Sequence, residues 1–168
     1  LAGKRLELLK ETLPKLTRVA VLWNPKEQSG PQQLPERQPA AKELGLLLYS
    51  MEVTAADKLE SAFKGAVNAG SAALDVTQGA FNNSYQKQIT ELAAKNGLPA
   101  IYTRKDYVEN GGLMSYGSDQ SEAYKRVAVM VDKILKGTKP ADIPVERPMK
   151  FEFVINLKAA KAIGLKHV

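Results

Sequence analysis

Short apolar runs alternate with amphipathic segments along most of the 168-residue chain. Runs with the character of buried strands occupy residues 18–23, 46–53, 72–76, 99–102, 111–114 and 151–156. Apolar residues recur at helical spacing over residues 6–14, 56–69, 84–95, 119–136 and 157–163, with a short helical turn at 104–109. Continuous apolar runs are typical of parallel strands that are buried on both faces. Strands and helices that alternate at this spacing predict an α/β fold with a doubly wound parallel sheet.

The clearest helix begins directly after a polar turn at residues 115–119. Asp119 and Glu122 stand three residues apart, the spacing at which side chains cap a first helical turn. An apolar stripe then continues to Gly137, and it consists of Tyr124, Val127, Val131, Ile134 and Leu135. Free N–H groups and the helix dipole point into such a turn, so this arrangement commonly holds a small ligand in α/β proteins.

Prolines interrupt the segment between the first two strands. Pro35 can occupy a first helical turn, but Pro39 would then lose a backbone hydrogen bond and clash with the carbonyl four residues earlier. We therefore expect a loop or a kinked, shortened helix over residues 26–38, followed by a turn at 40–44 that ends at Gly45.

The loops that follow the parallel strands are expected to share one edge of the sheet, because right-handed crossovers return each strand in the same direction. These loops are residues 24–30, 77–84, 103–107 and 115–119. Ligands of open α/β sheets bind at this edge. The four loops are therefore where the sequence places a candidate binding site.

Composition narrows the class of protein. No apolar run approaches the roughly 20 residues that a membrane-spanning helix needs, so we expect no such segment in this chain. The net charge is +6, but the lysines and arginines are scattered, which predicts a solvated surface and no nucleic-acid partner. The absence of cysteine excludes thiol chemistry, and the single histidine, His167, cannot form a catalytic triad or a multi-histidine metal site. We expect no metal and no cofactor.

Several residues near the predicted edge have two interpretations each. Asp75, within a strand, either faces the amine of a ligand, or caps a nearby turn or lies at the exposed end of the strand, since an unpaired buried carboxylate is costly. Trp23 ends a strand and either lines a cleft or completes the core, and we favour the core. Tyr102, Tyr107 and Tyr116 lie on or beside exit loops, where a ring can stack on a ligand or pack inward.

Catalysis finds little support in the sequence. Asp106 and Glu109 are the only carboxylate pair near the edge, and no nucleophile with a base lies in evident reach. The Asn-Asn-Ser run at residues 82–84 is interpreted as a helix cap rather than a ligand contact. The sequence therefore favours a binding protein over an enzyme.

Several blocks in order along nearly the whole chain form a recognisable pattern. They are Gly-Lys-Arg-Leu-Glu-Leu-Leu-Lys at 3–10, Val-Leu-Trp-Asn-Pro at 21–25, Gly-Gly-Leu-Met-Ser-Tyr-Gly at 111–117, Val-Asp-Lys-Ile-Leu-Lys-Gly at 131–137, Lys-Pro-Ala-Asp-Ile-Pro-Val-Glu at 139–146, and Val-Ile-Asn-Leu-Lys at 154–158 with its continuation through Leu165. Jointly these blocks resemble the ABC-transporter substrate-binding family that includes tryptophan-binding lipoproteins.

The resemblance implies a type I periplasmic binding protein, with two α/β lobes, a ligand between them and a hinge that the chain crosses several times. Family members are longer at the N-terminus, so we expect this chain to be a C-terminal fragment. Residues 1–114 would form the second ligand-binding lobe, and residues 115–140 a return segment and helix that belong to the missing first lobe. Residues 141–168 would be the connector, late strand and closing helix that return to the second lobe.

By position, the resemblance also implies a ligand site on the exit loops. Ser29 corresponds to a serine after the strand that ends at Asn24, while Gln78 and Gly79 occupy the place of an Asp/Asn-Thr ligand loop. The candidate ligand-binding residues are Asn24, Ser29, Gln78, Gly79, Thr103, Ser115, Tyr116 and Ser118. Because the Gln78-Gly79 loop differs from that of the tryptophan binders, the resemblance does not imply tryptophan as the ligand.

The leading hypothesis is the solute-binding component of an ABC importer, which would bind a small polar solute, with amino acids as candidates, by hinge closure. Its partner would be an ABC permease, and its location periplasmic or extracytoplasmic, with a lipid anchor in keeping with the family. The alternative is a ligand-sensing effector or input domain of a transcription regulator or signalling protein, and a small enzyme on a flavodoxin-like scaffold is the third class. Without its partner lobe, the apolar stripe after Asp119 would be exposed, so we expect the isolated fragment to form a homodimer.

Overall fold

The computed structural model describes residues 1–145 and 150–165, apart from the side chain of Gln120; His167 lies outside the described residues. The strands are β1 (Arg18–Trp23), β2 (Leu47–Glu52), β3 (Ala73–Val76), β4 (Ala100–Tyr102), β5 (Met114–Ser118) and β6 (Phe151–Ile155). The α-helices are α1 (Ala2–Thr12), α2 (Gly30–Gln33), α3 (Gln38–Glu43), α4 (Leu59–Asn68), α5 (Ala80–Ser84), α6 (Gln86–Lys95), α7 (Lys105–Glu109), α8 (Gln120–Leu135) and α9 (Leu157–Ala162). The short 3-10 helices are η1 (Pro35–Arg37), η2 (Ala56–Lys58) and η3 (Pro140–Asp142).

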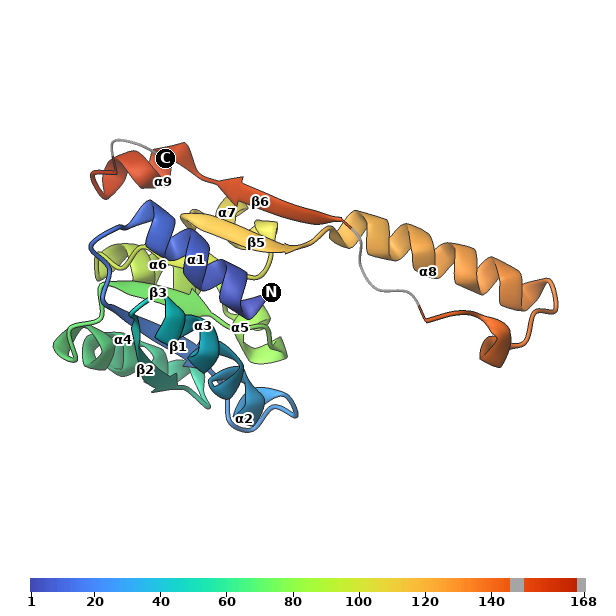
Figure 1. Cartoon of the computed structure of the whole chain (residues 1–168), viewed down its shortest axis with the longest axis horizontal. Helices are drawn as coiled ribbons and strands as arrows, with labels where there is room; N and C mark the ends of the chain where they lie inside the picture. Colours follow the sequence, from blue (N-terminus) through green and yellow to red (C-terminus); the bar gives the residue numbers. More distant parts are fainter. Residues whose placement is uncertain (146–149, 166–168) are drawn as a thin grey trace.

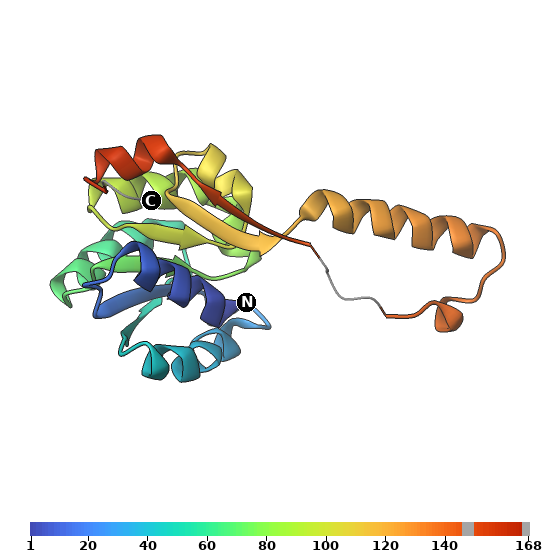
Figure 2. The ribbon, with the colours of Figure 1, turned by 45° about the horizontal axis from the view of Figure 1, so that its top comes forward.

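The strands form a six-stranded sheet in the order β2-β1-β3-β4-β5-β6. The predicted parallel arrangement is confirmed for β1 to β5, whereas β6 runs antiparallel to β5. The chain leaves β5 for α8 and comes back to the same edge of the sheet before it enters β6 (Figures 1 and 2). A strand that starts at the edge where its neighbour ends needs no crossover and must run in the opposite direction.

Helices cover both faces of the sheet (Figure 1). On one face, α4 and α6 enclose a core that includes Leu22, Phe63, Leu74 and Ile89. On the other face, α1, α3 and α9 pack over a second core, whose members include Leu6, Leu9, Val19, Ile101 and Met114. The doubly wound α/β fold expected from the sequence is therefore the observed fold.

Three short helical pieces, α2, η1 and α3, replace a single long helix between β1 and β2. Pro39 lies in the first turn of α3, where its missing N–H group removes no intrahelical hydrogen bond. Gly45 follows α3 with a φ of 66°, the left-handed conformation that ends helices. The expected kinked and shortened helix is confirmed, and it leaves residues 24–29 as a loop at the edge of the sheet.

Helix α8 and the segment after it form an arm that projects from the body (Figures 1 and 2). The Asp119 side chain caps α8 as predicted, since it accepts hydrogen bonds from the backbone N–H groups of Ser121 and Glu122. Residues 115–118, which sequence analysis placed in the return segment, pair with β4 and β6 in the sheet as part of β5. The arm therefore starts at Asp119 rather than at Ser115.

Candidate ligand-binding edge

An open groove of about 1050 Å³ lies at the carboxyl ends of β1 and β3. Its walls are the start of α1, the loop after β1 with α2, and the loop after β3 with the start of α5. The N-terminus, α2 and α5 lie on the side of the body that faces the arm (Figures 1 and 2). The groove is thus at the edge of the sheet where the sequence predicted a site.

Hydrogen bonds between the two loops fix the outer part of the groove. Asn24 Oδ1 accepts a hydrogen bond from Lys26 N at 2.9 Å, which turns the chain immediately after β1. The side-chain amide of Gln33 donates to Ser29 Oγ at 3.4 Å and to the Gln78 carbonyl oxygen at 3.3 Å. Gln33 therefore bridges the two walls and holds Ser29 and Gln78 near each other.

The carboxylate of Glu27 makes a second link between the two loops. Glu27 Oε1 accepts a hydrogen bond from Phe81 N at 2.7 Å, at the N-terminus of α5. A Cβ atom on Gly79 would lie 1.9 Å from Glu27 Oε2, so any other residue at this position would displace the carboxylate from where it lies. The Asn82 side chain stabilises the loop after β3, because its amide donates a hydrogen bond to the Thr77 carbonyl oxygen at 2.9 Å.

The floor of the groove contains a buried cluster of three charged side chains, Arg5, Arg37 and Asp75, called the charge cluster below. Arg37 Nε lies 2.5 Å from Asp75 Oδ2, and Arg5 Nε lies 3.5 Å from Asp75 Oδ1. Arg37 and Asp75 are fully buried, whereas Arg5 is 6% exposed and lines the groove. Burial lowers the pKa of Arg5, and the Asp75 carboxylate opposes that effect. The Arg5 guanidinium stays protonated at neutral pH.

A second, smaller hollow of about 90 Å³ lies where β4 and β5 end. Thr103, Ser115 and Ser118 line it, together with Asp106. The two strand ends approach closely, because a Cβ atom on Gly117 would lie 2.0 Å from the Thr103 carbonyl oxygen. Partial burial would raise the pKa of Asp106, but hydrogen bonds from Gln86 and Arg104 outweigh it and lower the pKa. Asp106 is therefore an ionised ion-pair partner of Arg104 and not a proton donor at neutral pH.

The structure divides the predicted ligand-binding residues between these two hollows. Ser29, Gln78 and Gly79 line the groove, and Thr103, Ser115 and Ser118 line the smaller hollow. Asn24 is buried and holds its own turn. Tyr116 packs against Phe151, with ring centroids 6.1 Å apart. Neither Asn24 nor Tyr116 is among the residues that line the two hollows.

The residues with two interpretations are also placed. Trp23 belongs to the core, as favoured, and its Nε1 donates to Ser50 Oγ at 2.9 Å. Tyr102 and Tyr107 pack inward and stack on each other with centroids 4.7 Å apart, and burial raises the pKa of both phenols. Asp75 neither caps a turn nor lies at an exposed end, because it is buried between two arginines.

The cap expected from residues 82–84 was wrong. Helix α6 begins after Tyr85 without a side-chain cap, and Asn83 Oδ1 instead accepts a hydrogen bond from the Tyr107 hydroxyl at 3.2 Å. Sequence reasoning also missed Arg5, Arg37 and Glu27. Two arginines in otherwise amphipathic or proline-rich segments give no signal by themselves, since their common partner is a strand residue far away in the chain.

Among residues 1–145 and 150–165, no helix is both long and apolar enough to cross a membrane. In the same residues, no group of three or more histidine, aspartate or glutamate side chains could hold a metal ion.

An open α/β sheet with a polar groove at the carboxyl ends of its strands defines a ligand-binding protein of the type I periplasmic binding protein fold. The profile of one family, described as ABC transporter substrate binding protein, matches residues 1–167. The chain belongs to this family, which consists of substrate-binding proteins and not of enzymes.

Several longer proteins are similar to this chain over nearly all of its residues. A tyrosine-binding protein of Clostridioides difficile is 24% identical over 166 residues, which cover 97% of this chain and 47% of the relative. A conserved domain protein from Vibrio cholerae has a TM-score of 0.89 at 24% identity, over 98% of this chain and 55% of its own. An ABC domain from Streptococcus pneumoniae, solved in complex with L-Trp, has a TM-score of 0.87 at 25% identity, over 98% of this chain and 57% of its own. The chain thus spans about half the length of these relatives.

Proposed function

We propose that this protein is the solute-binding component of an ABC importer and holds a small polar solute, with amino acids as the first candidates, at the groove. The observation that carries the proposal is the groove itself, whose walls are polar and fixed by hydrogen bonds between the loops after β1 and β3. Rigid polar groups at a strand edge orient a ligand without being reorganised by it. The names of two relatives, which mention tyrosine and L-Trp, support an amino acid as the solute.

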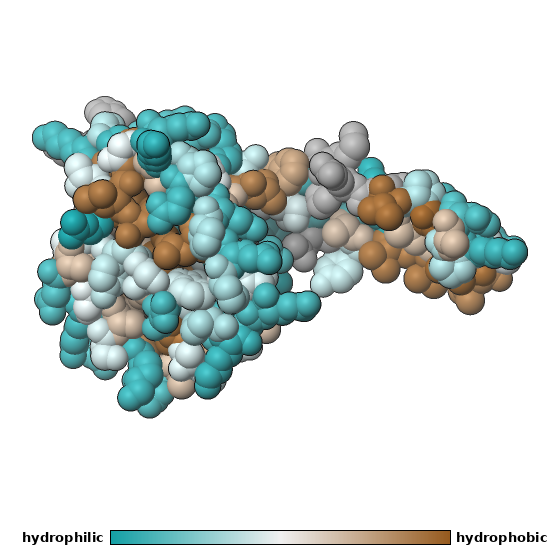
Figure 3. All heavy atoms as spheres, turned by 60° about the horizontal axis from the view of Figure 1, so that its bottom comes forward, coloured by the Kyte–Doolittle hydropathy of each residue, from teal (hydrophilic) through white to brown (hydrophobic). Residues whose placement is uncertain are grey.

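We further propose that the groove is one wall of a cleft between two lobes. On the arm, Tyr124, Val127, Val131, Ile134 and Leu135 are all exposed, with fractions from 42% for Ile134 to 82% for Leu135. Figure 3 shows hydrophobic side chains gathered along this arm. An apolar stripe of this length is rare on the surface of a monomer, because leaving it in water forgoes the free energy of burial. A second lobe that packs on the arm would cover the stripe and face the groove.

Residues 1–118 would then form one lobe, and the arm that begins at Asp119 would belong to the second lobe. Strand β6 and helix α9 would belong to the first lobe again. The two crossings lie side by side at the base of the arm, where Asp119 N donates to the Lys150 carbonyl oxygen at 3.0 Å and Lys150 Nζ lies 3.2 Å from Asp119 Oδ2. Adjacent crossings are suited to a hinge, since a few backbone torsions on each can change together. Closure about this hinge would enclose the solute and present the closed form to the permease.

Calorimetric titration of the full-length protein against the standard amino acids and other small polar solutes tests the proposal. We expect saturable binding of at least one amino acid, together with a smaller radius of gyration in solution scattering when it is bound. Residues 1–168 alone should bind the same solute far more weakly, because a groove with one wall buries too little of a small molecule. Saturable binding of none of these solutes would refute the proposed function. We place the protein in the periplasm or elsewhere outside the cytoplasmic membrane, with a lipid anchor on the full-length form.

A further inference from the structure

The charge cluster at the floor of the groove carries a surplus positive charge. Two guanidinium groups, from Arg5 and Arg37, share the single carboxylate of Asp75. All three side chains are at least nine-tenths buried. A buried charge without a partner of opposite sign is costly, so such a surplus calls for a counter-charge in the functional state.

Arg37 uses its interactions to hold the fold. Its Nε faces Asp75 Oδ2, and its Nη1 donates to the Gln33 carbonyl oxygen at 2.5 Å and to Gln33 Oε1 at 3.3 Å. Arg37 is the last residue of η1, and it is fully buried. Arg37 therefore neutralises Asp75 and supports Gln33, the residue that bridges the two walls of the groove.

One nitrogen of the Arg5 guanidinium is left for a ligand. Its Nη1 donates to the Tyr116 carbonyl oxygen at a long 3.3 Å, and its buried Nε faces Asp75 Oδ1 at 3.5 Å. Its Nη2 makes no hydrogen bond to another described residue. Arg5 is also the member of the cluster that lines the groove. A guanidinium that keeps its Nη2 group for a ligand at the floor of an open groove suits a carboxylate, to which its Nη groups can donate charge-assisted hydrogen bonds.

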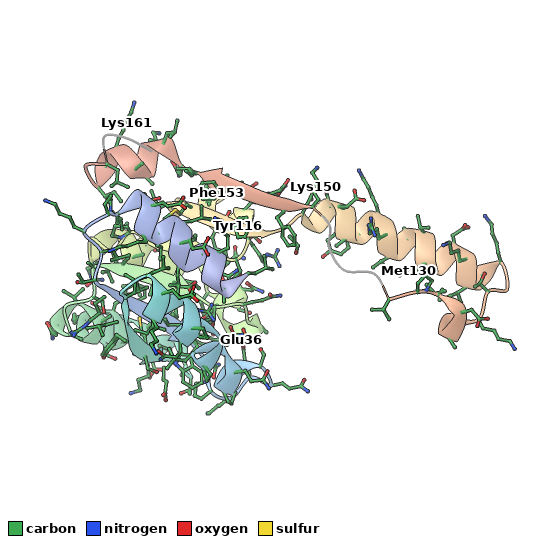
Figure 4. All side chains as sticks on the ribbon, viewed as in Figure 1. Glu36, Tyr116, Met130, Lys150, Phe153 and Lys161 are labelled. Carbon is green, nitrogen blue, oxygen red and sulfur yellow. The ribbon has the colours of Figure 1, made fainter. Side chains whose placement is uncertain are left out.

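The opposite charge lies higher in the same groove. Glu36 lines the groove, is exposed, and acts on Arg5 electrostatically. Figure 4 shows Glu36 close to the start of α1, the helix that carries Arg5. The groove thus offers a cation at its floor and an anion at its rim, which matches the two charged groups of an amino acid.

We propose that Arg5 is the carboxylate-binding residue of the groove and that the solute is an α-amino acid, held with its carboxylate at Arg5 and its ammonium group toward Glu36. This inference rests on the proposed function and narrows it, because a sugar or a simple amine has no carboxylate for the Arg5 guanidinium to bind. Asp75 and Arg37 are then positioning residues, which hold the Arg5 guanidinium in place beneath the groove.

Titration of the full-length protein with the standard amino acids and with their carboxamides tests the inference. A carboxamide keeps the shape of the amino acid and removes the negative charge, so we expect it to bind at least about 10-fold more weakly. Arg5→Gln should lower the affinity for the amino acid by about 10- to 100-fold and abolish the preference over the carboxamide. Arg18→Gln is the matched control, because Arg18 donates to the Ala69 carbonyl oxygen outside the groove. Its preference should equal that of the wild type.

Each outcome decides one question. If a carboxamide binds as tightly as its amino acid, or if Arg5→Gln keeps the wild-type preference, the inference is wrong while the proposed function stands. If no amino acid and no carboxamide binds, the proposed function fails and this inference fails with it. If Arg5→Gln does not fold, Arg5→Met takes its place, because methionine is an unbranched side chain without charge. A preference for the amino acid over its carboxamide that is unchanged in Arg5→Met would then overturn the inference.

Discussion

The charge cluster predicts a large loss of stability when its only carboxylate is removed. Asp75→Asn keeps the size of the side chain but leaves Arg5 and Arg37 facing each other without an anion between them. Asp75 is fully buried, so water cannot replace the lost charge. Removing one partner of a buried ion pair costs about 3–5 kcal/mol, which is a large part of the roughly 5–15 kcal/mol that stabilises a typical domain.

Urea unfolding of the full-length protein, followed by far-ultraviolet circular dichroism, measures this loss. We expect the unfolding midpoint of the part that contains Asp75 to fall by on the order of 1–2 M urea. Asp57→Asn is a control, since Asp57 is 73% exposed and lies 3.9 Å from Lys58 Nζ, and its free energy of unfolding should change by less than about 0.5 kcal/mol. A double variant with Asp75→Asn and Arg5→Gln should recover part of the loss, because it removes the repulsion between the two guanidinium groups. A loss below about 1 kcal/mol in Asp75→Asn, or strictly additive effects in the double variant, would refute the electrostatic explanation of this cluster.

Three other predictions concern the arm and the groove wall. Hydrogen bonds to Asp119, first from the Ser121 side chain, lower its pKa, so the cap it forms should be complete above about pH 4, the unfolded value, and weaken as the pH falls further. The protection factor of the Ser121 amide, which compares its hydrogen-exchange rate with that of an unstructured amide at the same pH, should therefore fall in acid and in Asp119→Ala; equal protection factors in variant and wild type would contradict this. Gly79→Ala should displace the Glu27 carboxylate and free the Phe81 amide at a cost of about 1 kcal/mol in stability, and a crystal structure with Glu27 unmoved would show that the loop has room for a side chain. Residues 1–168 alone should self-associate through the stripe on α8, and Val127→Lys with Val131→Lys should lower the sedimentation-derived mass to that of a monomer; a monomer at high concentration in the unmodified chain would mean that the stripe needs no cover.

Local chemistry accounts for what could be predicted in the fold. The continuous apolar runs identified β1, β3 and β4, in which nearly every position is buried. The strand expected at residues 111–114 was placed too early. The polar residues 115–118, expected as a turn, belong to β5 because their backbone pairs with β6. Asp119 could be recognised as a cap since it lies within three residues of the backbone groups that it binds. The antiparallel direction of β6 was missed, because it depends on where the chain re-enters the sheet and not on the composition of the strand.

The sequence by itself determined that this chain is an α/β unit with its exit loops at one edge, and that Ser29, Gln78 and Gly79 lie on those loops. Only the tertiary structure decided which charged side chains meet there. Arg5, Arg37 and Asp75 come from a helix, a proline-rich turn and a central strand, and they meet because α1 and η1 cover the same face of β3. Periodic burial and capping are set within a few residues of the chain, whereas the contacts of a buried charge are set by strand order and by helix packing, which no short stretch of sequence specifies.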